Sequence, residues 1–228
     1  MTHDVVTLFD LDNTLIDNDR IAADLRAHLE HAFGAVHAAR YWDIFEVLRR
    51  ELGYADYLGA LQRFRTETAF DPRLLSMSAY LVDYPVADRL YPGALEAIAH
   101  ADAWGPTVLL SDGDVVFQPR KVQRSGVWDA LDGRVLIYIH KETMLADVEA
   151  RWPARHYVMV DDKIRLLAAM KSVWRERLTT VWPRQGHYAL DANEVAKYPP
   201  ADVSLDRIGD LTNHDLATVL RLGRATAI

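Results

Sequence analysis

The sequence predicts an α/β fold in which a doubly wound parallel sheet carries an all-helical insert directly after its first strand. Short apolar runs rich in β-branched residues recur along the chain, and stretches with helical spacing lie between them. The runs are continuously apolar and do not alternate with polar residues, which is typical of strands buried on both faces of a parallel sheet. One long early stretch, in contrast, shows helical spacing alone.

The expected strands are short, and helices alternate with them along the second half of the chain. Alternation from Pro106 to Val181 indicates a doubly wound sheet. The strands are expected at Val5–Phe9, Thr107–Leu110, Val135–Ile139, Tyr157–Val160 and Leu178–Val181, with one more near Val203. Helices are expected at Ala94–Ala101, Gln118–Ser125, Thr143–Ala150, Ile164–Glu176 and Asn213–Leu222.

The early insert runs from about Asp17 to Leu90 and contains no strand-like segment. Its apolar residues recur at intervals of three and four, which is the periodicity of amphipathic helices. Gly34, Gly53 and Pro72 are the expected helix breaks. We therefore expect a helical unit at 17–89 and a sheet unit formed by 1–16 and 90–228.

Composition excludes several classes of function. The 228 residues contain no cysteine, which excludes disulfides, thiolate metal sites and cysteine nucleophiles. A formal net charge of −7 argues against a broad nucleic-acid surface. No apolar run reaches the length of a membrane span, and a strand-like run begins at Val5, which leaves no room for a signal peptide. We expect a cytoplasmic protein without a nucleic-acid or membrane partner, as a monomer or homodimer.

Polar side chains follow four of the expected strands, at the point where each strand ends. The carboxyl ends of parallel strands meet at one edge of a sheet, where ligands bind. Carboxylates suit a hard divalent cation, a lysine and a hydroxyl suit an anion, and one carboxylate is left to attack. These residues are Asp10 and Asp12 after the first strand, Ser111 after the second, Lys141 after the third, and Asp161 and Asp162 after the fourth.

In these four places the sequence resembles the haloacid dehalogenase superfamily. The segment Phe9–Leu15 matches the first motif, an apolar strand that ends in Asp-x-Asp-x-Thr. Val108–Gly113 matches the second motif, Tyr138–Lys141 the third and Val158–Asp162 the fourth. Any one of these motifs is a weak signal, but all four occur in the family's order. The resemblance implies a Rossmann-like core, with the helical insert in the place of the family's first type of cap domain.

The resemblance also implies a mechanism, that of a phosphatase dependent on Mg²⁺. Asp10 is then the nucleophile that becomes transiently phosphorylated, and Asp12 is the general acid and base. Ser111, Lys141 and the backbone near Asp112 bind the phosphoryl oxygens. The family places Mg²⁺ on the Asp10 carboxylate, the backbone carbonyl of Asp12 and the fourth motif. The expected substrate is a small phosphorylated metabolite.

The fourth motif departs from a common family pattern, because Arg165 stands where many members have a further acid. Asp161 is therefore expected to contact the metal directly, and Asp162 to act in the second shell or through water. Two lysines are interpreted as solvated surface charges: Lys121, in a helix-like stretch, and Lys163, beside the acid pair.

Two alternatives remain open at this point, a phosphomutase and a non-catalytic binding protein, and two more are disfavoured. A phosphomutase needs both Asp10 and Asp12 but returns the phosphoryl group to an isomeric product. A dehalogenase and a phosphonatase are disfavoured because those branches do not keep the second aspartate. A non-catalytic phospholigand-binding protein has no need of a nucleophile paired with an acid/base.

Overall fold

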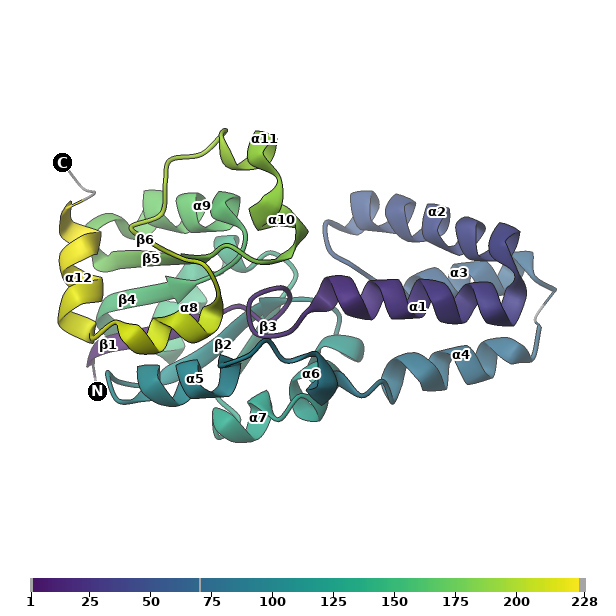
Figure 1. The fold of residues 1–228 in the computed structure, drawn as a ribbon, viewed down its shortest axis with the longest axis horizontal. Coiled ribbons are helices and arrows are strands. Elements are labelled where there is room, and N and C mark those ends of the chain that lie inside the picture. Colours follow the sequence, from purple (N-terminus) through teal and green to yellow (C-terminus); the bar gives the residue numbers. More distant parts are fainter. Residues whose placement is uncertain (1, 70, 226–228) are drawn as a thin grey trace.

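The computed structural model describes residues 2–69 and 71–225, and within these residues six parallel strands form one sheet (Figure 1). The strand order is β3-β2-β1-β4-β5-β6, so that the chain winds outward from β1 in both directions. This confirms the predicted doubly wound α/β fold. The strands are β1 (His3–Phe9), β2 (Thr107–Asp112), β3 (Val135–Tyr138), β4 (Ala154–Val160), β5 (Leu178–Pro183) and β6 (Val203–Leu205).

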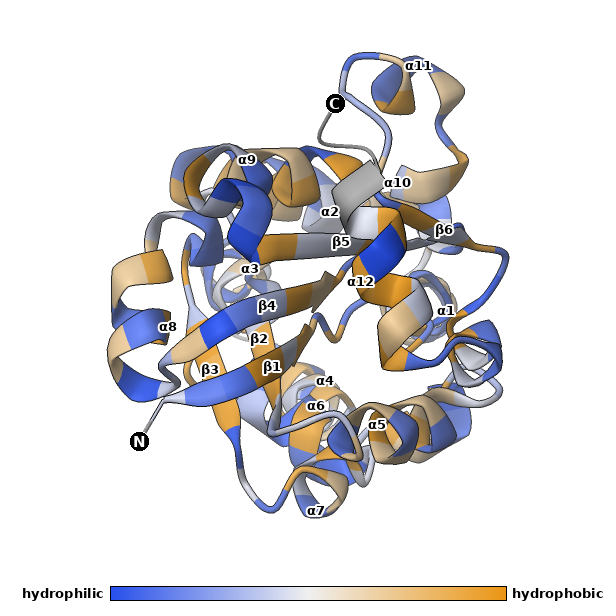
Figure 2. Cartoon of the chain, turned by 90° about the vertical axis from the view of Figure 1, so that its left-hand side faces the viewer, coloured by the Kyte–Doolittle hydropathy of each residue, from blue (hydrophilic) through white to orange (hydrophobic). Residues whose placement is uncertain are grey.

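Helices cover both faces of the sheet (Figure 2). Apolar residues of α8 and α9 pack on one face, and residues of α5, α7 and α12 pack on the other. Three short helices, α7, α10 and α11, were not predicted from the sequence. The helices are α5 (Ala94–Asp102), α6 (Phe117–Arg124), α7 (Val127–Ala130), α8 (Leu145–Arg151), α9 (Ile164–Trp174), α10 (Gly186–Leu190), α11 (Ala192–Val195) and α12 (Leu216–Ala225), with 3₁₀ turns η2 (Lys141–Thr143), η3 (Arg175–Arg177) and η4 (Ile208–Asn213).

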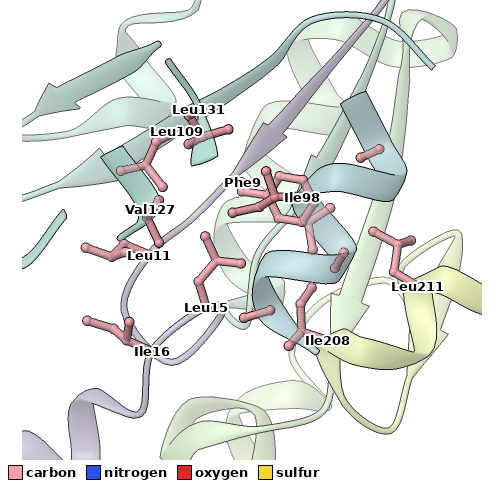
Figure 3. Packing of buried hydrophobic residues seen from close by; sticks show 14 of the residues in the cluster. Phe9, Leu11, Leu15, Ile16, Ile98, Leu109, Val127, Leu131, Ile208 and Leu211 are labelled. Atoms are coloured by element: carbon pink, nitrogen blue, oxygen red, sulfur yellow. The ribbon is translucent and has the colours of Figure 1, made fainter. Parts of the chain in front are cut away.

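The central strand β1 shows why its sequence is continuously apolar. Val6 and Leu8 lie in the cluster under α8 and α9, whereas Phe9 lies in the opposite cluster with Ile98 of α5 (Figure 3). Successive side chains of a strand point to opposite faces. Both faces of β1 are buried, and so both sets of side chains are apolar.

The helical insert lies to one side of the sheet and has its own apolar core (Figure 1). The α1 helix begins after Asp17, whose side chain accepts a hydrogen bond from the Arg20 N–H at 2.8 Å. Gly34, Gly53 and Pro72 stand at the ends of helices, as predicted. The elements are α1 (Asn18–Phe33), α2 (Ala35–Leu52), α3 (Tyr57–Glu67), α4 (Arg73–Val82) and the 3₁₀ turn η1 (Val86–Arg89).

The two connections between insert and sheet run side by side. Ile16 and Leu90 form an antiparallel bridge, and the Asp17 N–H donates to the carbonyl of Arg89 at 2.7 Å. The chain therefore leaves and re-enters the sheet unit through one paired crossing. None of the helices in the described residues is long and apolar enough to span a membrane.

Candidate active site

A tight turn after β1 presents the first pair of carboxylates. Asn13 adopts a left-handed conformation (φ 62°), and the Leu11 carbonyl accepts a hydrogen bond from the Leu15 N–H at 2.9 Å. The Thr14 hydroxyl accepts a hydrogen bond from the Asp162 N–H at 3.0 Å. The turns that follow β1 and β4 are thus joined, and this brings the first and fourth motifs together at one edge of the sheet.

Three buried carboxylates meet at this edge. Asp10, Asp161 and Asp162 each place a carboxylate oxygen within 4.8 Å of the others. The Lys141 ammonium, which is fully buried, lies 2.5 Å from Asp10 Oδ1 and 2.7 Å from Asp161 Oδ2. The single positive charge of Lys141 therefore balances one of the three negative charges, and its contacts orient Asp10 and Asp161.

The pKa values of these groups show a local excess of negative charge. Burial alone would raise the pKa of Asp10, but Lys141 and Lys163 outweigh it and the pKa lies below its usual value. Burial raises the pKa of Asp161 and raises that of Asp162 much further, and each is raised again by neighbouring carboxylates. Those carboxylates in turn hold the pKa of Lys141 well above its ordinary value despite burial. Of the three carboxylates, Asp10 is thus the one best kept ionised.

The carboxylate cluster fits a divalent cation. Among the described residues, Asp10 Oδ2, Asp161 Oδ2 and both carboxylate oxygens of Asp162 are buried and have no hydrogen-bond partner. Unpaired buried carboxylate oxygens are costly, and coordination of a hard cation would satisfy them. Asp161 is more occupied, because its Oδ1 accepts the Lys163 N–H at 2.8 Å and its Oδ2 faces Lys141. Asp162 thus offers more free carboxylate oxygens than Asp161 does, and the expectation that Asp161 is the direct ligand stays a prediction.

The second motif supplies groups for an anion. Ser111 is buried, and its hydroxyl lies 3.4 Å from Asp10 Oδ1. The Asp112 carboxylate accepts the backbone N–H of Lys141 at 2.7 Å and thereby fixes the turn that carries this lysine. Burial raises the pKa of Asp112 to about 6, although Lys141 opposes the rise. All six side chains that the four motifs predicted therefore lie in one neighbourhood, together with Asp112.

The structure corrects the interpretation of two lysines as solvated surface charges. Lys121 is only 2% exposed, and its ammonium contacts both carboxylate oxygens of Asp12, at 2.5 and 2.7 Å. Lys163 is half-buried, its pKa is raised by Asp162 and Asp10 despite burial, and its ammonium lies 5.2 Å from the ring centre of Tyr188. Helical periodicity alone could not show that the α6 face bearing Lys121 turns toward the site.

A cavity of about 830 Å³ opens from this edge toward the helical insert. The sheet unit contributes polar groups to its wall, and the insert contributes aromatic rings and arginines. The segment after β5 also reaches it: the His187 ring lies 2.6 Å from Asp19 of α1. The lining residues from the insert include Arg26, Trp42, Phe45, Arg49, Tyr54 and Tyr57.

The family model of the haloacid dehalogenase-like hydrolases matches residues 6–173, which include all four motifs. The chain belongs to this family. A haloacid dehalogenase-like hydrolase from Burkholderia xenovorans LB400 is 67% identical in sequence, with a TM-score of 0.89 over 93% of this chain and 99% of that one. No curated protein matches the hydrolase at a significant level.

More distant solved structures share the fold of this hydrolase. An L-2-haloacid dehalogenase from Xanthobacter autotrophicus with covalently bound chloropropionic acid is 18% identical, with a TM-score of 0.58 over 93% of this chain and 98% of that one. A hydrolase from Bacillus subtilis bound to magnesium is 15% identical, with the same TM-score and the same coverage of both chains. At this level of identity the likeness concerns the fold alone.

Proposed function

We propose that this hydrolase is a Mg²⁺-dependent phosphatase that acts on a small phosphate monoester in the cytoplasm. The observation that carries the proposal is the set of unpaired, buried carboxylate oxygens on Asp10 and Asp162. Three acids crowd together there with two lysines, so one negative charge remains to be balanced. A divalent cation would balance that charge, and the hydrolase from Bacillus subtilis, which has the same fold, is bound to magnesium.

Asp12 separates this proposal from a dehalogenase, which the relative from Xanthobacter autotrophicus makes the natural rival. Esters of alcohols have a poor leaving group, and a positioned carboxyl group that donates a proton to it speeds its departure. Asp12 lies on the wall of the cavity, two residues after Asp10 of the carboxylate cluster. It is held there by side chains of α6, as an acid/base residue must be held.

The residues that would hold Mg²⁺ are Asp10, Asp162, Asp161 and the backbone carbonyl of Asp12. When bound, the ion would neutralise charge on the phosphoryl oxygens. Ser111 and Lys141 would bind these oxygens from the other side, together with backbone N–H groups at Leu11 and Asp112.

The reaction then proceeds in two steps. A carboxylate oxygen of Asp10 forms a bond to phosphorus, the bond from phosphorus to the ester oxygen breaks, and Asp12 gives its proton to the departing alcohol. Water next attacks phosphorus while Asp12 takes one of its protons. The bond between phosphorus and Asp10 breaks, which releases inorganic phosphate and restores the carboxylate of Asp10.

Turnover of p-nitrophenyl phosphate by the purified protein, with Mg²⁺ and with EDTA, tests the proposal. We expect release of both p-nitrophenol and inorganic phosphate that depends on Mg²⁺ and is absent in Asp10→Asn. Halide release from L-2-chloropropionate without phosphatase activity would instead identify a dehalogenase. Isomerisation of a sugar phosphate without phosphate release would identify a phosphomutase, and binding of phosphate esters without turnover a non-catalytic protein.

A further inference from the structure

Lys121 is the group near the site that the family motifs do not explain. It is carried by α6, on the turn of helix after Gln118, and both side chains are almost fully buried. A buried ammonium is costly unless it is paired, and Lys121 is paired with Asp12. The ion pairs of Asp10 and Asp161 are formed by a different lysine, Lys141.

Three contacts hold the Asp12 carboxylate in one orientation. Lys121 Nζ donates to Asp12 Oδ1 at 2.5 Å and lies 2.7 Å from Oδ2. Gln118 Nε2 donates to the same Oδ2 at 3.2 Å and to the Ser111 hydroxyl at 2.9 Å. Lys121 also donates to Asn18 Oδ1 at 3.2 Å, in the first turn of α1. The carboxylate is therefore tied to the phosphate-binding serine on one side and to the insert on the other.

The packing around α6 keeps these contacts in place. A Cβ atom at Gly113 would lie between 2.6 and 2.9 Å from the Gln118 side chain, so only glycine leaves room for it. The Lys121 ammonium lies 5.3 Å from the ring centre of Phe117, which itself packs on Tyr57 of α3. The position of Lys121 thus follows from the packing of α6 against the helical insert.

We propose that Lys121 is a positioning residue that aims the Asp12 carboxylate at the reacting phosphorus. This inference rests on the proposed phosphatase function. Without Lys121 the carboxylate keeps the weaker bond from Gln118 alone and is free to rotate. Misplacing a catalytic group by about 1 Å costs a rate factor on the order of 100. The loss should be largest in hydrolysis of the phosphorylated Asp10, where Asp12 must take a proton from water.

The test compares Lys121→Met with the wild-type protein on p-nitrophenyl phosphate and Mg²⁺. The p-nitrophenolate ion leaves without a proton, so the first step needs little help from Asp12. We expect kcat to fall on the order of 100-fold, while kcat/KM changes little because it reports only the first step. Rapid mixing should show a burst of p-nitrophenolate before the slow steady state, since the phosphorylated enzyme accumulates.

Two further variants separate positioning from folding. Lys171→Met removes a partly buried ion pair near the start of β5, where Lys171 Nζ lies 2.7 Å from Asp202 Oδ2, and should show no burst. The natural chain has no cysteine. In Lys121→Cys, alkylation with bromoethylamine therefore modifies one thiol only and rebuilds an ammonium of nearly the original length. Most of the lost kcat should return with it.

Each other outcome has a definite meaning. A raised KM with an unchanged kcat would show that Lys121 binds the phosphate and would overturn the inference. Equal losses of kcat and kcat/KM without a burst, or no recovery after aminoethylation, would overturn it too. If the wild-type protein shows no turnover, the proposed phosphatase function is wrong. If the wild type is active, the results for the Lys121 variants bear only on the role of Lys121.

Discussion

Replacing Asp112 with asparagine should stabilise the metal-free protein at neutral pH. Burial raises the pKa of this carboxyl from 3.8 to about 6, with a further contribution from Asp10. Each pKa unit corresponds to about 1.4 kcal/mol. The folded protein therefore loses up to about 3 kcal/mol of unfolding free energy when Asp112 ionises. Asparagine keeps the oxygen that accepts the Lys141 N–H and does not ionise.

The sign follows from the direction of the shift. A carboxyl whose pKa is higher in the folded state contributes stability below its unfolded value of 3.8, and this contribution disappears as the pH rises through about 6. Asp112→Asn and the wild type should thus be about equally stable near pH 4. Near pH 7.5 the variant should be more stable by about 2 to 3 kcal/mol.

Urea unfolding in EDTA at the two pH values measures this difference. Asp161 and Asp162 also have raised pKa values, but both residues are present in the wild type and in the variant. The difference in stability between the two proteins therefore reports on Asp112 alone. Asp132→Asn is the matched control, since its side chain is 82% exposed. A gain in stability that is the same at both pH values, or a loss near pH 7.5, would refute the reasoning.

Three further predictions concern the site. Asp10→Asn should fold normally but lose turnover to below about one thousandth of the wild-type rate, because an amide is neither an effective nucleophile nor an anionic ligand. Circular dichroism measures the folding and phosphate release measures the turnover. Retained activity would contradict the role of Asp10. Asp162→Asn should raise the Mg²⁺ concentration for half-maximal activity by at least about tenfold, which corresponds to a loss of roughly 1.4 kcal/mol of binding free energy. Asp161→Asn should raise it less. A Mg²⁺ titration with the opposite ranking would support the order expected from the sequence. Trifluoroberyllate with Mg²⁺ should slow hydrogen exchange of amides where insert and sheet face each other more than deep in the sheet; equal protection with and without the mimic would leave no support for a closing insert.

The sheet could be predicted from the sequence because each of its central strands is apolar on both faces. Such runs have few other stable placements, and the polar residues that end them converge by topology alone. The positions of Asp10, Ser111, Lys141 and Asp162 followed in this way. The short helices α10 and α11 were missed because they have too few turns to show a periodic pattern.

The role of Lys121 could not be predicted for a different reason. Its contact with Asp12 joins two residues far apart in the chain, and it depends on how α6 is rotated against β1. Lys121 is surrounded in sequence by Arg120 and Arg124, which donate to backbone carbonyls of the insert's end. From the sequence the three cations look alike. Only packing distinguishes the one that turns inward.

The place of the insert in the chain also affects how the protein can be made. Phe9 of β1 pairs with Leu109 and with Val160, which the ribosome adds much later. At ordinary rates of synthesis β1 waits roughly 10 to 30 s for its second neighbour. The contacts of α1 to α4 are local by comparison, and such contacts form fast. The insert can therefore fold before β1 meets its neighbours in the sheet.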